Sequence, residues 1–267
     1  MPKAIYIFLN FVDMRKIIFQ IAILSFLTTC LLACGEDRSD AQETDPNAIQ
    51  EILDEDGHVI AKGKYNEAKN KEGIWISYYS DGKVKDSANY INNELEGRFI
   101  SFFPNGRKMS DGFYISDKPE GEWNYWNENG GIIEKSTWKD GKPHGISYTY
   151  HDYGKVQSSV NWSEGKMDGE WRYYDSEGNL IELTNYKAGL KDGEAFQFYE
   201  DSTLKAKANF NNELPHGIFE EFYPTGILKS QVEFIDGKME GDMVKFDSTG
   251  AILTIETYTN GVTNIVE

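Results

Sequence analysis

Aromatic and apolar residues recur along this chain at a fixed step of 24 residues. Each unit begins at a glycine, and the eight leading glycines are Gly73, Gly97, Gly121, Gly145, Gly169, Gly193, Gly217 and Gly241. Five residues after each glycine stands an aromatic, at Tyr78, Phe102, Trp126, Tyr150, Tyr174, Phe198, Phe222 and Phe246. Seventeen residues after it stands another, at Tyr90, Tyr114, Trp138, Trp162, Tyr186, Phe210, Phe234 and Tyr258. A fixed period of this length is the signature of an array of repeated units.

Turn-forming residues divide each unit into two short strands. A second glycine stands nine residues after the first in every unit except one, where Ser202 takes its place. The pairs Asp81-Gly82 and Asn105-Gly106 are typical of these turns, because Asn-Gly and Asp-Gly supply the positive φ angles of tight hairpins. The pattern predicts a strand of about seven residues, a turn, a second strand of about seven, and a polar loop of about six, such as residues 139–144.

A unit this short cannot hold a stable helix as well. We therefore expect an all-β fold, an elongated single-layer antiparallel meander of about eight to nine stacked 24-residue hairpins. Such a sheet has no second layer, so the two aromatic columns and an apolar column eleven residues after each leading glycine are expected to pack down one face. On this interpretation the aromatic columns are the core.

The repeat has a recognisable form. Residues Gly169 to Gly178 follow the pattern G-x-W-x-x-Y-x-x-x-G, and a later aromatic and a glycine-bearing loop complete the unit. This resembles the MORN repeat in its bacterial variant form, and the chain resembles the YwqK family of antitoxins. The resemblance covers roughly residues 57–262. It implies an elongated, twisted sheet that serves as a binding and tethering platform.

Residues 1–33 are typical of a bacterial lipoprotein signal. A basic start at Met14-Arg15-Lys16 precedes an apolar run from Ile17 to Leu32, which is too short and interrupted for a comfortable membrane span. The run ends at Leu31-Leu32-Ala33-Cys34, which resembles a lipobox, so Cys34 is the predicted lipidation site. The alternative is an ordinary secretory signal with an incidental cysteine. Met14 is the better start, because it places the basic pair at the N-terminus.

The rest of the chain divides into a tether, a cap, the repeats and a tail. Cys30 and Cys34 are the only cysteines, so cleavage before Cys34 leaves no disulfide. Residues 34–50 read as an acidic flexible tether, 51–72 as a degenerate capping repeat, 73–262 as eight repeats and 263–267 as a tail. Glu36 and Asp37 resemble an export signal to the outer face, so we expect an outer-membrane location. The sequence does not decide between the cell surface and the periplasmic face of that membrane.

Charge limits the partners. The chain carries 27 basic and 44 acidic residues, and the part after residue 34 has a net charge of −19. Such a surface repels nucleic acid and anionic lipid headgroups. The acids could simply keep a long sheet soluble, or they could steer a basic partner toward it.

Catalytic and metal-binding motifs are lacking. His144 and His216 occupy the same loop position three repeats apart, so their spacing is repeat geometry. The segment Asp54-Glu55-Asp56-Gly57 lacks the spaced ligands and closing Glu of a calcium loop. No Ser-His-Asp order, CxxC or HExxH motif is present. We expect no enzyme activity, no metal and no cofactor.

The candidate binding residues are those that depart from the repeat. Two residues after the leading glycine most units have a large side chain, but Ser147 and Ala195 are small. In both units an aromatic follows one residue later, at Tyr148 and Phe196, and a step of one turns a side chain to the opposite face. This predicts a notch beside Trp123 and Trp171, with Tyr148 projecting the other way. The alternative is local repacking with no ligand.

Three functions are compatible with this pattern. The first, which we favour, is a lipid-anchored envelope scaffold that binds a protein, a peptide or a surface polymer such as a glycan. The second is an antitoxin or immunity protein that masks a toxin, as the family resemblance implies. The third is a structural spacer.

Overall fold

The computed structural model describes residues 48–263, and the fold is all-β within that range. The predicted signal segment, Cys34, most of the tether and the last four residues of the tail lie outside the described residues. In the part of the chain that is described, no helix has the length and apolar character needed to cross a membrane.

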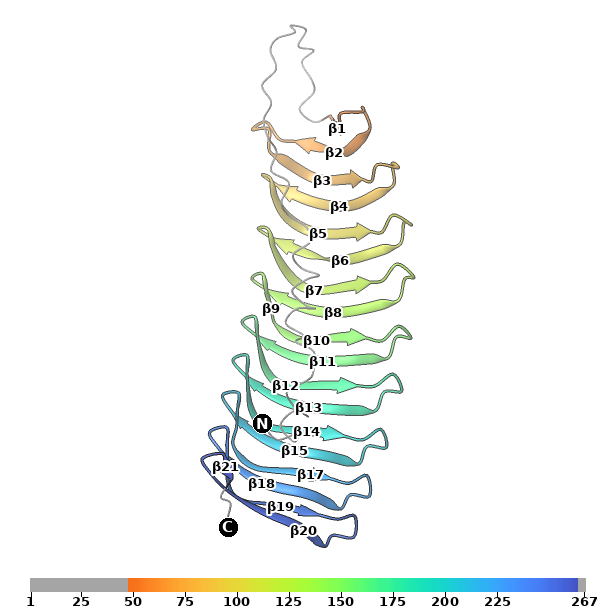
Figure 1. Cartoon of the computed structure of the whole chain (residues 1–267). Coiled ribbons are helices and arrows are strands. Elements are labelled where there is room, and N and C mark those ends of the chain that lie inside the picture. Colours follow the sequence, from red (N-terminus) through yellow and green to blue (C-terminus); the bar gives the residue numbers. More distant parts are fainter. Residues whose placement is uncertain (1–47, 264–267) are drawn as a thin grey trace. The chain divides into compact units, whose positions relative to one another are not determined.

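The described residues form one sheet of 21 strands (Figure 1). The first half of the sheet comprises β1 (Gln50–Leu53), β2 (Val59–Tyr65), β3 (Lys71–Tyr78), β4 (Val84–Ile91), β5 (Glu94–Phe102), β6 (Lys108–Ile115), β7 (Lys118–Trp126), β8 (Ile132–Lys139), β9 (Lys142–Pro143), β10 (Gly145–Tyr150) and β11 (Val156–Ser163). The second half comprises β12 (Lys166–Tyr174), β13 (Leu180–Lys187), β14 (Leu190–Phe198), β15 (Leu204–Asn211), β16 (Leu214–Pro215), β17 (Gly217–Phe222), β18 (Leu228–Ile235), β19 (Lys238–Phe246), β20 (Ile252–Thr259) and β21 (Val262–Thr263).

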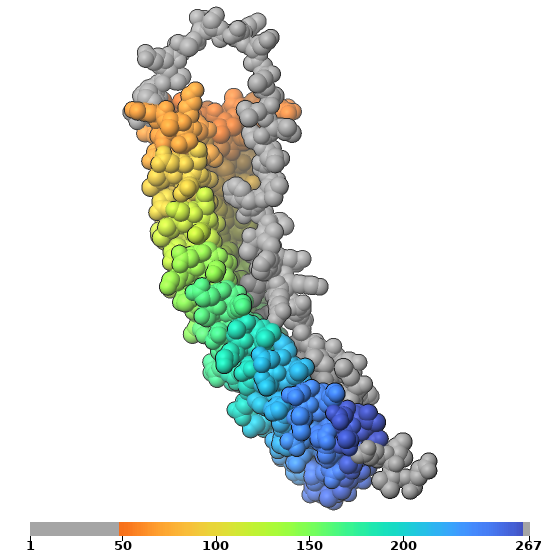
Figure 2. Space-filling view, turned by 90° about the vertical axis from the view of Figure 1, so that its left-hand side faces the viewer, coloured from red at the N-terminus to blue at the C-terminus, as the bar shows by residue number. Residues whose placement is uncertain are grey.

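Successive strands pair antiparallel, so the sheet is a meander of hairpins. β3 pairs with β4, β4 with β5, and the order continues to β20 and β21, except that β8 pairs with both β9 and β10, and β15 with both β16 and β17. Two strands are interrupted by a histidine: His144 separates β9 from β10, and His216 separates β16 from β17. Figure 2 shows the units as successive bands of colour from the first hairpin to the last. The predicted antiparallel meander of stacked hairpins is confirmed.

The turn within each repeat follows the prediction. In the first repeat the Gly82 amide donates to the Tyr79 carbonyl at 2.9 Å, and the Tyr79 amide donates to the Lys83 carbonyl at 2.8 Å. Gly82 has a φ of 79°, which explains the glycine at this position. Ser202, the exception, adopts a φ of 68° in the same turn.

The connection between repeats differs from the prediction. Instead of a polar loop of about six residues, Ile91 pairs directly with Glu94, and Asn92 and Asn93 form a two-residue turn with φ angles of 51° and 74°. Two successive positive φ angles are the mark of a type I′ hairpin turn. The loop prediction was wrong because polar residues at the ends of exposed strands continue the hydrogen-bond ladder.

Strand alternation gives the sheet two faces with different roles. We call inner the face that carries positions 2, 4, 13, 15 and 17 after each leading glycine and the position two before it; the opposite face is the outer face. All the buried apolar side chains of the described residues belong to the inner face: Trp75, Ala88, Leu95, Trp123, Val160, Trp171, Ala195, Ala206, Ala208, Phe210, Phe219, Val232, Phe234, Met239, Met243 and Tyr258. The core is therefore one face of the sheet.

The two aromatic columns lie on opposite faces. The later column is inner: the Tyr114 ring lies 5.0 Å from Trp123, edge to face. The earlier column is outer, because Phe198 stacks at 6.4 Å on Phe196, two residues away on the same strand. The expectation that both columns share one face was wrong. The cause is the strand pairing: Trp75, two positions after the leading glycine, pairs with Ala88, fifteen positions after it. Even positions of the first strand and odd positions of the second strand therefore share one face.

Large and small side chains alternate on the inner face. Trp75 lies over Gly63 and Trp123 over Gly112; a β-carbon at either glycine would stand 2.3 Å or 2.2 Å from the indole ring. Contacts that short are impossible, so these two glycines make room for the rings. This interdigitation closes the inner face where the sheet has no second layer.

Candidate functional site

The five residues predicted for binding do not form one surface. Trp123, Ser147 and Trp171 lie in one inner-face column, where they are 3%, 6% and 6% exposed. Tyr148 and Phe196 lie half-buried on the outer face, opposite Ser159 and Leu183. Ser147 faces the larger Val160 across the pair β10–β11, which offsets its small volume. A binding role for the notch beside Ser147 stays a prediction.

Two inner-face tryptophans use their indole N–H to hold the sheet. Trp75 Nε1 donates to the Lys64 carbonyl at 2.9 Å, and Trp123 Nε1 donates to the Phe113 carbonyl at 3.1 Å. Trp171, two repeats after Trp123, differs: its buried Nε1 has no hydrogen-bond partner among residues 48–263. The same column therefore contains two satisfied indoles and one unsatisfied one.

A buried carboxyl lies near Trp171. Thr184 pairs with Trp171 across β12–β13, and its hydroxyl donates to Glu182 Oε1 at 3.1 Å. Glu182 is 2% exposed, and within the described part of the chain its Oε2 has no hydrogen-bond partner. Burial raises the pKa of Glu182 above its ordinary value, although the nearby Lys191 charge and the Thr184 and Gln197 hydrogen bonds favour the ionised form.

Glu182 is not among the binding residues predicted from the sequence. Glu182 occupies position 13 of its repeat. At the same position, Ser158 in the preceding repeat pairs with Thr149 at 2.7 Å, and Ser110, three repeats earlier, pairs with Ser101 at 2.6 Å. Position 13 is polar in most repeats, so the expectation of a wholly apolar inner face misses the polar side chains there. Asp86 and Glu134 are also acidic at this position, so the sequence alone does not single out Glu182; of the three acids it is the one that the sheet buries.

The outer face has a half-exposed aromatic in every repeat. These side chains are Tyr78, Phe102, Trp126, Tyr150, Tyr174, Phe198, Phe222 and Phe246. Lysine amines lie over some of the outer rings, with Lys108 Nζ 5.7 Å from the Trp126 centroid and Lys207 Nζ 5.7 Å from that of Phe196. Such cation–π contacts leave the ring edges available to a partner.

Aliphatic and aromatic side chains between these rings are more exposed. Ile74 is 65% exposed, and Phe113 and Ile146 are each 51% exposed, all on the outer face. Beside Phe113, Asp111 accepts from Arg98 at 2.9 Å and from Lys108 at 2.8 Å. Partial burial pushes the pKa of Asp111 upward, but the two cations outweigh it and hold that pKa below its ordinary value. A shallow depression of about 460 Å³ lies among these residues.

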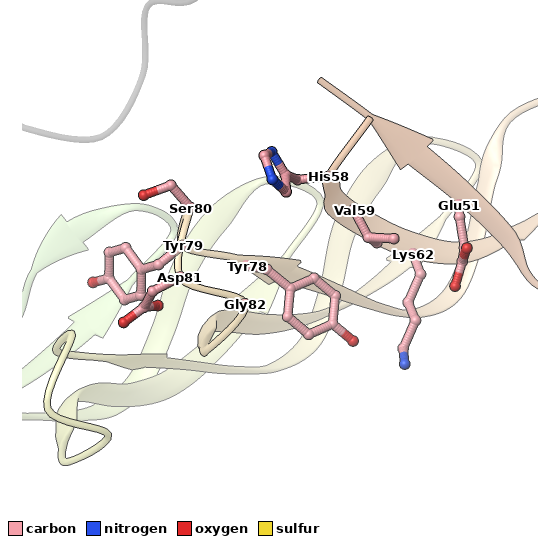
Figure 3. Close-up of a pocket in the computed structure, with 9 residues that line it drawn as sticks. All are labelled: Glu51, His58, Val59, Lys62, Tyr78, Tyr79, Ser80, Asp81 and Gly82. Atoms are coloured by element: carbon pink, nitrogen blue, oxygen red, sulfur yellow. The ribbon is translucent and has the colours of Figure 1, made fainter. Parts of the chain in front are cut away.

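A second depression, of about 410 Å³, lies where the capping hairpin meets the first repeat (Figure 3). Figure 3 shows Lys62 and Tyr78 pointing the same way, and the Lys62 amine lies 5.4 Å from the ring centroid. Hydrogen bonding to the Tyr78 hydroxyl raises the pKa of Lys62. The depression is open and has mixed charge, with Glu51 and Asp81 also on its walls.

Metal ligands converge at one place in residues 48–263. Asp54, Asp56 and His58 bring their ligand atoms within 4.8 Å of one another. Asp54 Oδ1 already accepts the amides of Asp56 at 3.0 Å and His58 at 2.9 Å, so this carboxylate closes its own turn. We assign no metal to this loop.

His144 and His216 replace a structural carboxylate. In other repeats the residue before the leading glycine is acidic and accepts the amide of a turn residue: Glu96 accepts from Ser116 at 2.9 Å, and Glu120 accepts from Asp140 at 2.8 Å. His216 instead lies 3.7 Å from Asp236 through Nδ1. The two histidines belong to different repeats and are not a pair.

Comparison with known proteins gives one informative match. The model of the MORN repeat variant family matches residues 71–92, 119–140, 167–188, 191–212 and 215–236. These segments correspond to five of the eight repeats. Each includes the turn within the repeat and ends at the first residue of the connecting turn. A search of curated proteins finds no match.

Solved structures give only weak likenesses. A mutant of S. aureus TarM in complex with fondaparinux, alpha-GlcNAc-glycerol and UDP matches at 15% identity and a TM-score of 0.21, over 45% of this chain and 19% of that one. TcdB2-TccC3-TEV matches at 11% identity and a TM-score of 0.19, over 80% of this chain and 15% of that one. This chain thus spans less than a fifth of either protein, and these scores carry no argument. This chain thus contains five repeats that match the MORN repeat variant, in a sheet of stacked hairpins.

Proposed function

We propose that this protein is a non-enzymatic binding module of the bacterial envelope, anchored through a lipid on Cys34, and that its outer face binds a protein or a surface polymer. MORN repeats are often binding or scaffold modules, which supports the general class. The partner, the anchor and the outer-membrane location are the specific parts of the proposal.

The outer aromatic column is the observation that carries it. The inner face supplies the buried core, yet a half-exposed aromatic recurs on the opposite face in all eight repeats. Half-exposed aromatics, with exposed apolar side chains such as Ile74 and Ile146 between them, are typical of surfaces that bury on association. A structural spacer would have no need of them, because polar side chains would keep that face soluble.

Charge favours a basic partner. The part of the chain after residue 34 has a net charge of −19, which accelerates encounter with positively charged proteins and slows encounter with nucleic acid. A basic toxin delivered to the envelope would fit the same surface. The second candidate function is therefore an immunity protein that neutralises a toxin by binding it.

Site-specific crosslinking in intact cells tests the binding face. A photoreactive phenylalanine analogue is placed at Phe196 or Tyr148 on the outer face, and at Tyr114 on the inner face as control. We expect captured partners from the outer positions and none from Tyr114. One stoichiometric basic exported protein would favour the immunity function, whereas polysaccharide or many envelope proteins would favour a scaffold. Equal capture from both faces, or none from either, would remove the proposal.

The anchor is tested separately with a fatty-acid analogue. The native chain should incorporate the label and fractionate with membranes, and Cys34→Ser should do neither. Cys30→Ser is the matched control and should behave as the native chain does. Labelling that survives Cys34→Ser would contradict the proposed anchor.

A further inference from the structure

We propose that strand β20 is an interface between two copies of this chain, in which the free edge of β20 pairs antiparallel with the same edge of a second copy. The inference goes beyond the proposed function, because it concerns one end of the sheet and does not depend on the outer aromatic column. β20 and β21 lie at that end (Figure 1).

The first support is the missing partner of β20. In the preceding repeat, β18 pairs with β17 on one side and with β19 on the other over most of its length. β20 pairs with β19 in the same way, but on its other side β21 reaches only Tyr258 and Thr259. Among residues 48–263, no strand lies on that side of residues 252–257. The backbone groups that point away from β19 there are available to a further strand.

The second support is the exposure of apolar side chains on this strand. Ile252 and Leu253 are each 61% exposed and Ile255 is 56% exposed, whereas the corresponding residues of β18 are half-buried beside the next repeat. Thr254 is exposed as well, although its counterpart Ser230 is only 5% exposed. The edge of β20 thus leaves open the surface that a following strand covers elsewhere in the sheet.

The sequence of this edge lacks the features that usually prevent pairing. Exposed edge strands are commonly protected by charged residues, by proline or by being short. Residues 251–255 contain no charge and no proline, in a chain with a net charge of −17, and β20 is eight residues long. At the other end of the sheet β1 has four residues, and the exposed Glu51 is one of them. Of the two ends, that of β20 is the one suited to pairing.

A second copy is the occupant that matches this edge. An antiparallel pair of identical strands places the same uncharged apolar segment on both sides, so no unpaired charge is buried. Glu256, the nearest charge on the strand, is already paired with Lys245 at 2.7 Å. A head-to-tail contact with β1, in the register of β18 with β19, would instead set Glu51 opposite Ile255. The two-fold contact also closes on itself, whereas a head-to-tail contact leaves edges free for further copies.

Pairing through β20 has a consequence for binding. A two-fold axis perpendicular to the sheet puts the outer faces of both copies on the same side of one continuous sheet. A partner with repeated units could then bind both copies at once, which raises its apparent affinity.

Sedimentation equilibrium of the full chain in density-matched detergent micelles tests the interface. We expect the native chain to form a dimer and Ile255→Lys to raise the dissociation constant about tenfold or more, because it places a charge on both sides of the contact. Ile74→Lys is the matched control: Ile74 is 65% exposed on the outer face, away from the edge, and its replacement should leave the dimer intact. Circular dichroism checks that both variants keep the sheet.

Two outcomes of that measurement would overturn the proposal. One is a dimer that survives Ile255→Lys. The other is a native chain that stays monomeric at every concentration, as it would if the residues after Thr263 or another protein covered the edge.

Cysteine crosslinking distinguishes the two-fold contact from a head-to-tail one. Ile255→Cys, treated with a short bismaleimide, should give a covalently linked dimer, with the native chain as the background for Cys30 and Cys34. Leu53→Cys, at the similarly exposed edge of β1, should give no more than that background. A head-to-tail contact predicts that a mixture of the two variants crosslinks and that neither does so alone. Crosslinking only in the mixture would contradict the two-fold interface.

Discussion

Both faces of this sheet are built from the same eight repeats, but different constraints act on their side chains. On the inner face the residues are matched in size across strands: Trp123 lies over Gly112, and Ser147 faces Val160. On the outer face Ile74, Arg98 and Glu122 occupy one column without any such matching. The inner face is constrained by packing, and the outer face lacks that constraint. An aromatic that recurs in every repeat can therefore belong to the core or to the surface, and the face on which it lies decides which.

Removing a tryptophan should lower stability most on the inner face, and clearly less on the outer face. Trp123→Ala should lower the stability of the sheet by about 4 kcal/mol, because it removes a buried ring and its hydrogen bond. Trp126→Ala removes a half-exposed outer ring and should cost about 2 kcal/mol. Chemical denaturation of the two variants measures the difference. Equal losses would break the distinction between the faces.

A single methyl group tests the size matching itself. Gly112→Ala should destabilise by about 3 kcal/mol, because the new β-carbon would meet the indole at 2.2 Å. Gly106→Ala is the matched control: it has open space but a φ of 83°, so only backbone strain of about 1–2 kcal/mol is expected. The midpoints of denaturation of the two variants measure the difference in stability. A Gly112→Ala variant no less stable than Gly106→Ala would show that the ring can move aside freely.

The pH dependence of stability should reflect the buried inner carboxyl. Burial raises the pKa of Glu182 above its ordinary 4.5, so the folded state holds its proton at a pH where the unfolded chain has lost it. The stability that this proton provides is complete below about 4.5, the unfolded value, and declines as pH rises through the folded value.

Glu182→Gln should therefore match the native chain in stability at low pH and exceed it near neutrality. Glu122→Gln, an exposed change on the outer face, should alter stability by less than about 0.5 kcal/mol at any pH. Thermal unfolding at a series of pH values measures both. If the native chain were more stable than Glu182→Gln at neutral pH, the raised pKa of Glu182 would be contradicted.

The smallest effect concerns a turn at the rim, which neither face controls. Ser202 holds a φ of 68° where seven repeats have glycine, so Ser202→Gly should relieve about 1 kcal/mol of backbone strain. That corresponds to a rise in Tm of about 2–4 °C for a sheet of this size. Gly178→Ser, the reverse change in the neighbouring repeat, should lower Tm by a similar amount. A fall in Tm for Ser202→Gly would mean that the serine makes a compensating contact.

The sequence predicts the hairpins well because their determinants are local. The period of 24 residues and the glycine at each turn, such as Gly82 with its φ of 79°, define the strands without reference to the rest of the chain. The face of the aromatic column at Trp126 depends on which residues pair across strands. That pairing is set by the two-residue turns at positions such as 92–93, which a polar sequence does not distinguish from a longer loop.

The candidate site was predicted in part for the same reason. Small residues at Ser147 and Ala195 mark departures from the repeat, but they do not reveal which departures leave a polar group unsatisfied. Gly112 and Val160 occupy the same position in two different repeats. The difference between them matters because each lies beside a tryptophan of the inner face, which only the structure shows. Glu182 likewise becomes notable only because its column is buried.

Hydroxyl-radical footprinting of the tryptophans most directly tests the division between a packed inner face and an accessible outer face. The account predicts that Trp126, on the outer face, is oxidised several times faster than Trp75 and Trp123, which are each 3% exposed. Equal oxidation of all three in the folded protein would contradict it, because the inner face would then be open to solvent and could not be the core.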